Sequence, residues 1–145
     1  MYAKVKDIKN QFQKRSFKEG TFIDESELKK IILRKSRYIN ARICFRYVVP
    51  IDEFLNCESY AILNQICVWL VTSEVEEISQ VARTIPKDSK LIKDRSADLM
   101  ELAMDELLRV ESGKTVLSDA NENRPSRIVH SPCQPTTFKK GVTQW

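Results

Sequence analysis

The sequence predicts an all-α fold: a small bundle of about four helices around a central apolar helix, with an extended C-terminal arm. Three observations predict it. Apolar residues recur at helical spacing in four segments. The most apolar run, residues 60–71, would be apolar over most of a helix's circumference, so other helices have to cover it. The helical period is lost after Thr115, so we divide the chain into a helical domain, residues 1–113, and an extended arm, residues 114–145.

The first two helices are each marked by an apolar stripe. A short helix is expected within residues 1–17, and a second from about Glu25 to Phe45. Asp24, followed three residues later by Glu27, forms a capping-box signature at the start of the second helix. The stripes consist of Tyr2, Val5, Ile8 and Phe12 in the first segment and of Leu28, Ile31, Ile32, Ile39 and Ile43 in the second.

The central helix is expected from about Glu53 to Val81. Pro50 ends the preceding helix because it disfavours helical backbone at the residue before it, and Asp52 is placed to cap the central helix. Only a narrow strip of this helix is expected to face water. The strip consists of Glu58, Gln65, Thr72 and Glu76.

A membrane span is the alternative interpretation of this central segment. A transmembrane helix needs roughly 20 consecutive apolar residues. Asn64 and Gln65 interrupt the run, and Glu74, Glu76 and Glu77 follow it. We therefore expect no membrane span.

The last helix is expected from about Leu91 to Glu111, after a linker at residues 83–90 that contains Pro86. Gly113 stands where a helix C-terminal cap belongs. Four acidic residues at helical spacing form an acidic ridge on the side away from the apolar stripe. They are Asp94, Asp98, Glu101 and Asp105. The acidic ridge is either a solvated face or a surface that pairs with a basic partner.

The second helix carries a basic face opposite its apolar stripe, formed by Lys30, Arg34 and Arg37. Charges in such a position usually face water, and the alternative is contact with something acidic. Leu33 lies near this face and hints at a partner surface.

The arm is rich in Asn, Ser, Thr and Pro and has few apolar residues. Such a segment cannot bury enough surface to order itself. It nevertheless contains Phe138 and Trp145, large apolar side chains of the kind found at the centres of interfaces. We expect the arm to become ordered on a partner, and simple terminal disorder is the alternative.

No catalytic or metal-binding motif is present in the sequence. Its one histidine, His130, lies in the arm, and the four cysteines show no C-x-x-C spacing. We expect Cys44, Cys57 and Cys67 to be buried or half-buried thiols and Cys133 to be a tail thiol. With 24 basic and 20 acidic residues, the net charge of +4 does not by itself indicate nucleic acid. These features favour an interaction protein over an enzyme.

Several short motifs resemble those of the phage head–tail connector, or adaptor, proteins. The opening residues 1–8, with Phe12, are similar to the usual start of that family. Residues 39–43, followed by residues 46–51, are similar to its central motif, in which an Arg-Tyr pair precedes a turn that contains proline. The final helix running into Ser112-Gly113-Lys114 is also similar, and the resemblance covers the chain from its start to this point.

The resemblance implies a structural virion protein without enzymatic activity or cofactor. Such subunits form a ring, usually dodecameric, beneath the portal protein of a tailed virus. The ring extends the DNA channel toward the stopper or tail and contacts the passing double-stranded DNA non-specifically. The implied location is the head–tail interface of the virion, and the host cytoplasm during assembly. The arm is then expected to dock on the portal through Arg127, Ile128, Phe138 and Trp145.

A ring requires two complementary faces on each subunit. We predict that the basic face of one subunit meets the acidic ridge of the next. A small helical DNA-binding regulatory protein is the alternative, with Arg34 and Arg37 contacting phosphate. A helical enzyme subunit without an active site of its own is a third possibility.

Overall fold

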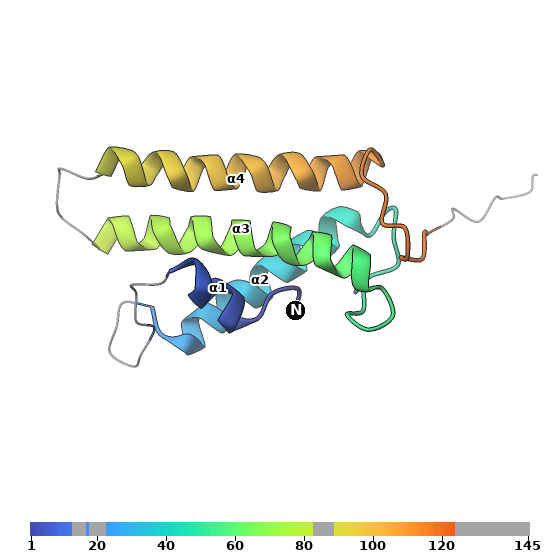
Figure 1. Ribbon diagram of the computed structural model, residues 1–145, viewed down its shortest axis with the longest axis horizontal. Helices are drawn as coiled ribbons and strands as arrows, with labels where there is room; N and C mark the ends of the chain where they lie inside the picture. The colour runs from blue at the N-terminus through green and yellow to red at the C-terminus, as the bar shows by residue number, and fades with distance from the viewer. Residues whose placement is uncertain (13–16, 18–22, 83–88, 124–145) are drawn as a thin grey trace, which may run out of the picture.

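In the part of the chain that it describes, the computed structural model is a bundle of four helices (Figure 1). It describes residues 1–12, 17, 23–82 and 89–123, without the side chains of residues 80–82 and 89–94. The helices are α1 (Val5–Gln11), α2 (Glu25–Ile43), α3 (Cys57–Ala82) and α4 (Ser89–Ser112). The described residues form no strand, only an isolated β-bridge, so the predicted all-α class is confirmed.

The central helix of the bundle is α3, which packs against each of the other three. In Figure 1, α4 runs antiparallel along one side of α3, and α1 and α2 lie on the other side. The fully buried apolar side chains of α3 are Leu63, Ile66, Cys67, Leu70, Val71 and Val75. A helix that is apolar over most of its circumference has to be enclosed in this way.

The strip of α3 that was expected to face water does so only in its first half. Glu58 and Gln65 are exposed, but Thr72 and Glu76 are buried. The prediction for these two residues is wrong because α4 covers the second half of α3. Arg95 of α4 reaches the Glu76 carboxylate at 3.4 Å, which places a positive charge beside this buried group.

Tyr2 ties the start of the chain to three other segments. It is buried, and its backbone N–H donates to Ser36 Oγ on α2 at 3.0 Å. Its hydroxyl donates to Asn40 and accepts from the backbone N–H of Ile51 at 3.1 Å. Its carbonyl accepts from Asn64 Nδ2 on α3 at 2.7 Å. Every polar group of this buried residue is therefore paired, as stability requires.

The segment after α4 folds back onto the bundle. Tyr47, in the loop after α2, is fully buried and its hydroxyl accepts from Leu117 N–H at 3.2 Å. Val48 N–H donates to the carbonyl of Asn121 at 2.8 Å. The packed body therefore includes residues 115–123, beyond the predicted boundary between helical domain and arm. The division into these two domains otherwise stays a prediction.

Asp119, from this returning segment, caps the start of α3. Its Oδ2 accepts from Glu58 N–H and its Oδ1 accepts from Ser59 N–H, both at 3.0 Å. The first turn of a helix has N–H groups without an internal acceptor, and Asp119 supplies one. Asp52 was predicted for this role, but its Oδ1 instead accepts from the N–H groups of residues 54–55 and closes the preceding turn.

Gly113 ends α4 in the left-handed conformation, with φ at +76°. Its N–H donates to the carbonyl of Val110 at 3.2 Å, and Thr115 N–H donates to the carbonyl of Arg109 at 3.0 Å. These bonds satisfy the last carbonyls of the helix, so the predicted C-terminal cap is confirmed. The guanidinium of Arg46 lies where a Cβ would have to be. Glycine is therefore favoured here by the left-handed backbone, while the guanidinium, at the end of a flexible side chain, could move aside for a Cβ.

Replacing Asp119 with Ala should lower the free energy of unfolding, because two backbone donors of α3 lose their acceptor. The hydrogen bond from the Ser59 hydroxyl is the main cause that lowers the pKa of Asp119. A carboxylate with a lowered folded pKa adds stability above its unfolded pKa, and this stability is lost as the pH falls through the folded pKa. Urea unfolding at stepped pH should therefore show a full difference between wild type and variant at neutral pH. That difference should shrink below about pH 4.

Asp105→Ala is the matched control, since this exposed carboxylate has no ion pair or hydrogen bond within the described part of the chain. Its removal should give no comparable loss at neutral pH. Equal unfolding curves for wild type and Asp119→Ala would contradict the assigned cap.

Replacing Gly113 with Ala should lower the free energy of unfolding by about 1–2 kcal/mol, because the Cβ of alanine makes the left-handed conformation unfavourable. The Arg46 guanidinium, at the end of a flexible side chain, has to move aside but adds little to that cost. Lys114→Ala, a change at an exposed neighbour, is the control in the same urea titration. An unchanged unfolding midpoint for Gly113→Ala would show that the turn does not depend on glycine.

Candidate interaction surfaces

The acidic ridge lies on the outward face of α4. Its described members are Asp98, Glu101 and Asp105. All three side chains are exposed, and within the described residues none of them forms an ion pair or a hydrogen bond. Asp94 belongs to the same helix, but its side chain lies outside the description. Leu102 and Leu108, also exposed on α4, add apolar area to this helix's surface. The ridge is therefore available to a basic partner.

Arg34, predicted for the basic face of α2, is used inside the molecule. It forms an ion pair with Glu74 of α3, and Lys35 contacts the same carboxylate at 2.9 Å. Glu74 is half-buried, and burial lowers the pKa of Lys35. Arg34 and Lys35 therefore hold α2 on α3, and the sequence pattern on α2 alone does not reveal this.

The other two residues of the basic face point outward. Lys30 forms a surface ion pair with Glu27 at 3.2 Å, and exposed pairs of this kind contribute little and exchange readily. Arg37 is exposed and has no hydrogen bond or ion pair among the described residues. Lys30 and Arg37 therefore remain as the part of the basic face that a partner could contact.

One end of the bundle, which we call the apolar end, carries large exposed apolar side chains. They are Phe45, Val48, Phe54, Leu55 and Val116. The loop between α2 and α3 and the segment after α4 meet at this end (Figure 1). Phe45, Phe54 and Leu55 are 88%, 89% and 81% exposed, so they contribute almost nothing to the core. Large apolar side chains exposed in neighbouring segments are candidates for an interaction site.

Sequence reasoning missed the apolar end. Phe54 and Leu55 follow the predicted cap Asp52, where an apolar pair suggests the start of a buried helix. The helix instead begins at Cys57, and the pair occupies the turn before it. The sequence pattern did not show that the helix starts as late as Cys57, so the exposure of this pair could not be predicted from it.

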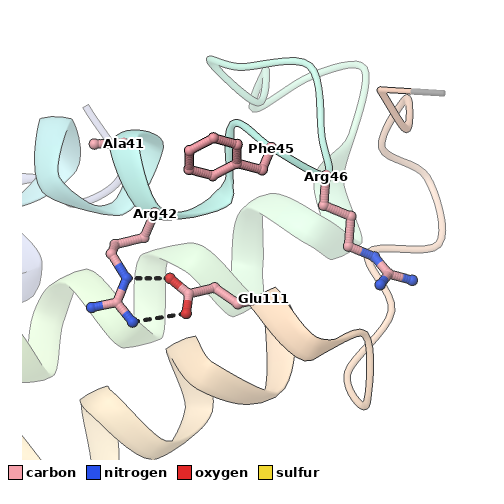
Figure 2. Close-up of a pocket in the computed structure, with 5 residues that line it drawn as sticks. All are labelled: Ala41, Arg42, Phe45, Arg46 and Glu111. Carbon is pink, nitrogen blue, oxygen red and sulfur yellow. Dashed lines mark hydrogen bonds and ion pairs between the residues drawn. The ribbon is translucent and has the colours of Figure 1, made fainter. Parts of the chain in front are cut away.

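A pocket of about 330 Å³ lies between the ends of α2 and α4, lined by Ala41, Arg42, Phe45, Arg46 and Glu111. Figure 2 shows Arg42 and Glu111 joined by two parallel hydrogen bonds, of which the Arg42 Nη2 to Glu111 Oε2 bond is 2.7 Å. This pairing raises the pKa of Arg42 and fixes the plane of its guanidinium. The Phe45 ring lies above this pair, and the Arg46 side chain extends away from it toward the end of α4 (Figure 2). The pocket therefore combines a flat ionic pair, an aromatic ring and a cation.

Of the three described cysteines, one is more exposed than predicted. Cys44 is half-buried and Cys67 is buried, as expected, but Cys57 is exposed because it begins α3 at the molecular surface. Burial raises the pKa of the Cys67 thiol to about 11, so it stays protonated and unreactive at neutral pH. Cys133 lies outside the described residues.

Four residues were predicted to dock on the portal. They also lie outside the described residues, so this role stays a prediction. They are Arg127, Ile128, Phe138 and Trp145.

Within the described ranges, no helix is both long and apolar enough to cross a membrane. No group of three or more His, Cys, Asp or Glu side chains in those ranges is arranged to hold a metal ion. Comparison of the chain with protein-family models, curated proteins and solved structures found no match. Its function therefore has to be argued from its own surfaces.

Proposed function

We propose that this chain is a structural protein of a tailed virus particle, a head–tail connector or adaptor. Its copies assemble into a ring beneath the portal vertex and extend the DNA channel toward the stopper or tail. The protein acts in the virion and is assembled in the host cytoplasm, and it needs neither catalysis nor a cofactor. The arm docks on the portal protein.

The observation that carries the proposal is the presence of two outward faces of opposite charge on one chain. Asp98, Glu101 and Asp105 of the acidic ridge form no ion pair or hydrogen bond among the described residues, and Lys30 and Arg37 point outward from α2. Because the two faces are different surfaces of the same chain, pairing them joins copies head to tail. A head-to-tail series that closes on itself is a ring.

Charge pairing of this kind sets register more than it adds affinity. An exposed ion pair contributes about 0–1 kcal/mol, so a ring held by such pairs alone is weak in solution. Binding of many arms to neighbouring portal subunits raises the effective concentration of the copies around the portal. This is consistent with a protein that assembles on a template. A mild net charge of +4 also suits a channel through which DNA must pass without being held.

The residues that carry the resemblance to adaptor proteins have structural roles, which supports the proposal. Tyr2, Tyr47 and Ile51 are buried and lie at the junctions between segments. Gly113 closes α4. The residues that resemble the adaptor family are therefore residues on which the fold of this chain depends, and not a few exposed side chains.

The alternative, a small helical DNA-binding regulator, finds less support. It assigned Arg34 and Arg37 to phosphate contacts, and Arg34 is paired with Glu74. One free arginine and an exposed lysine make a weak phosphate-binding surface.

Reversing the charge of the acidic ridge with Asp98→Lys and Asp105→Lys should weaken ring assembly about tenfold or more, because two attractions become repulsions. The measurement is the mass of the assembly by light scattering with portal protein present. A second variant, with Lys30→Glu and Arg37→Glu, should not assemble by itself. Mixed with the first variant it should restore assembly, because each face then meets a face of opposite charge. Lys6→Glu, at an exposed position on α1, is the control. An unchanged mass for the first variant would contradict the charged interface.

A chain that ends at Asn123 should keep the helical content and unfolding midpoint of the full chain but lose binding to portal protein. The cut has to follow Asn123 because its N–H donates to the carbonyl of Arg46 at 2.7 Å. A chain cut after Gly113 is the comparison, and it should unfold more easily since it lacks Asp119. Surface plasmon resonance on immobilised portal measures binding. Full affinity after the cut at Asn123 would rule out docking by the arm.

A further inference from the structure

The turn formed by residues 52–55 presents two apolar side chains to solvent on a fixed backbone. Asp52 Oδ1 accepts from the N–H of Phe54 at 2.8 Å and of Leu55 at 3.0 Å, and the Asp52 carbonyl accepts from Asn56 N–H at 3.1 Å. Ile51, immediately before the turn, is buried. The turn is therefore held at its base, and Phe54 and Leu55 are kept outward without further ordering.

These exposed side chains have a large unused capacity to stabilise a contact. Removing a Phe or Leu side chain from water is favourable, and Phe54 and Leu55 are almost fully exposed. The flanking Glu53 forms a surface ion pair with Lys4 at 2.7 Å, so its charge is matched within the chain. A preorganised contact loses little entropy on binding, so more of the burial energy appears as affinity.

The pocket between α2 and α4 has the size and chemistry to receive this turn. An apolar cavity of about 150 Å³ is enough to hold benzene, and the pocket measures about 330 Å³. It therefore has room for the phenyl ring of Phe54 and part of Leu55. The Arg42–Glu111 pair and the Phe45 ring offer flat surfaces on which an aromatic ring can stack (Figure 2).

The charges of the two surfaces are complementary. The turn carries Asp52, of which Oδ2 has no hydrogen bond within the described part of the chain. Arg46, which also lines the pocket, donates from Nε to the Tyr47 hydroxyl at 3.3 Å and forms only a long, half-exposed ion pair with Glu122, at 3.6 Å. A carboxylate that arrives with Phe54 can therefore take a hydrogen bond from Arg46.

We infer that the turn of one copy, residues 52–55, inserts Phe54 and Leu55 into the Arg42–Phe45–Arg46–Glu111 pocket of a second copy. Within one chain the turn does not fill its own pocket, since Phe54 and Leu55 are exposed and do not line it. Turn and pocket are different surfaces, so the contact is head to tail and can repeat around a ring. The inference rests on the proposed function in that both require self-assembly. It adds an apolar anchor to the charged faces.

The test uses two variants of the full chain that each block one side of the contact. The turn variant carries Phe54→Ser with Leu55→Ser, and the pocket variant carries Ala41→Trp, which fills the pocket from an exposed helical position. All three positions are exposed, so both variants should keep the circular dichroism spectrum and unfolding midpoint of the wild type. Val116→Ser, at the same end of the bundle but outside turn and pocket, is the control and should associate as the wild type does.

Native mass spectrometry and sedimentation at millimolar concentration should show self-association of the wild type and none of either variant alone. An equimolar mixture of the two variants should form a dimer and nothing larger, because only one intact turn and one intact pocket remain per pair. A monomeric wild type, a turn variant that associates normally, or a mixture without a dimer would overturn the inference.

The same variants separate this inference from the proposed function. A dimer in the mixture, together with a wild type that does not bind portal protein, would keep the contact and remove the connector role. Portal-bound rings that form normally from the turn variant would keep the connector role and remove the contact.

Discussion

The bundle depends on the enclosure of α3. This helix is apolar over most of its surface, so it needs neighbours on nearly all sides. α4 covers one side, α1 and α2 cover the other, and the returning segment of residues 115–123 closes its N-terminal end. The charged side chains of α2 and α4 therefore lie on the outward faces of these two helices. The same requirement that builds the body therefore determines which surfaces remain for partners.

Local patterns were enough to predict the helices and two of their ends. Asp24 accepts from the N–H of Glu27 at 2.7 Å, as the capping box predicts, and Gly113 ends α4. The apolar stripe of α2 is buried as predicted. These features depend on residues within one or two helical turns of one another, so the sequence contains the whole of the information.

What the sequence could not supply is the set of pairings between distant segments. Asp119 caps a helix that begins some sixty residues earlier, and Asp52 was the nearer but incorrect choice. Glu76 is buried, and Arg95 of another helix forms an ion pair with it. Arg34, on a face that the pattern of α2 leaves to solvent, is paired across to Glu74. In each case a polar side chain meets a partner that only the tertiary structure brings near.

The hydrogen bonds of residues 115–123 also have a mechanical consequence. Asn123 and Val48 join this segment to the loop after α2, and Asp119 joins it to the first turn of α3. Tension applied to the chain beyond Asn123 therefore reaches α2 and α3 through these bonds before it can reach α4 along the backbone. A load at this point is therefore shared between α2 and α3, so pulling on the end of the chain strains the body before it can unravel the last helix.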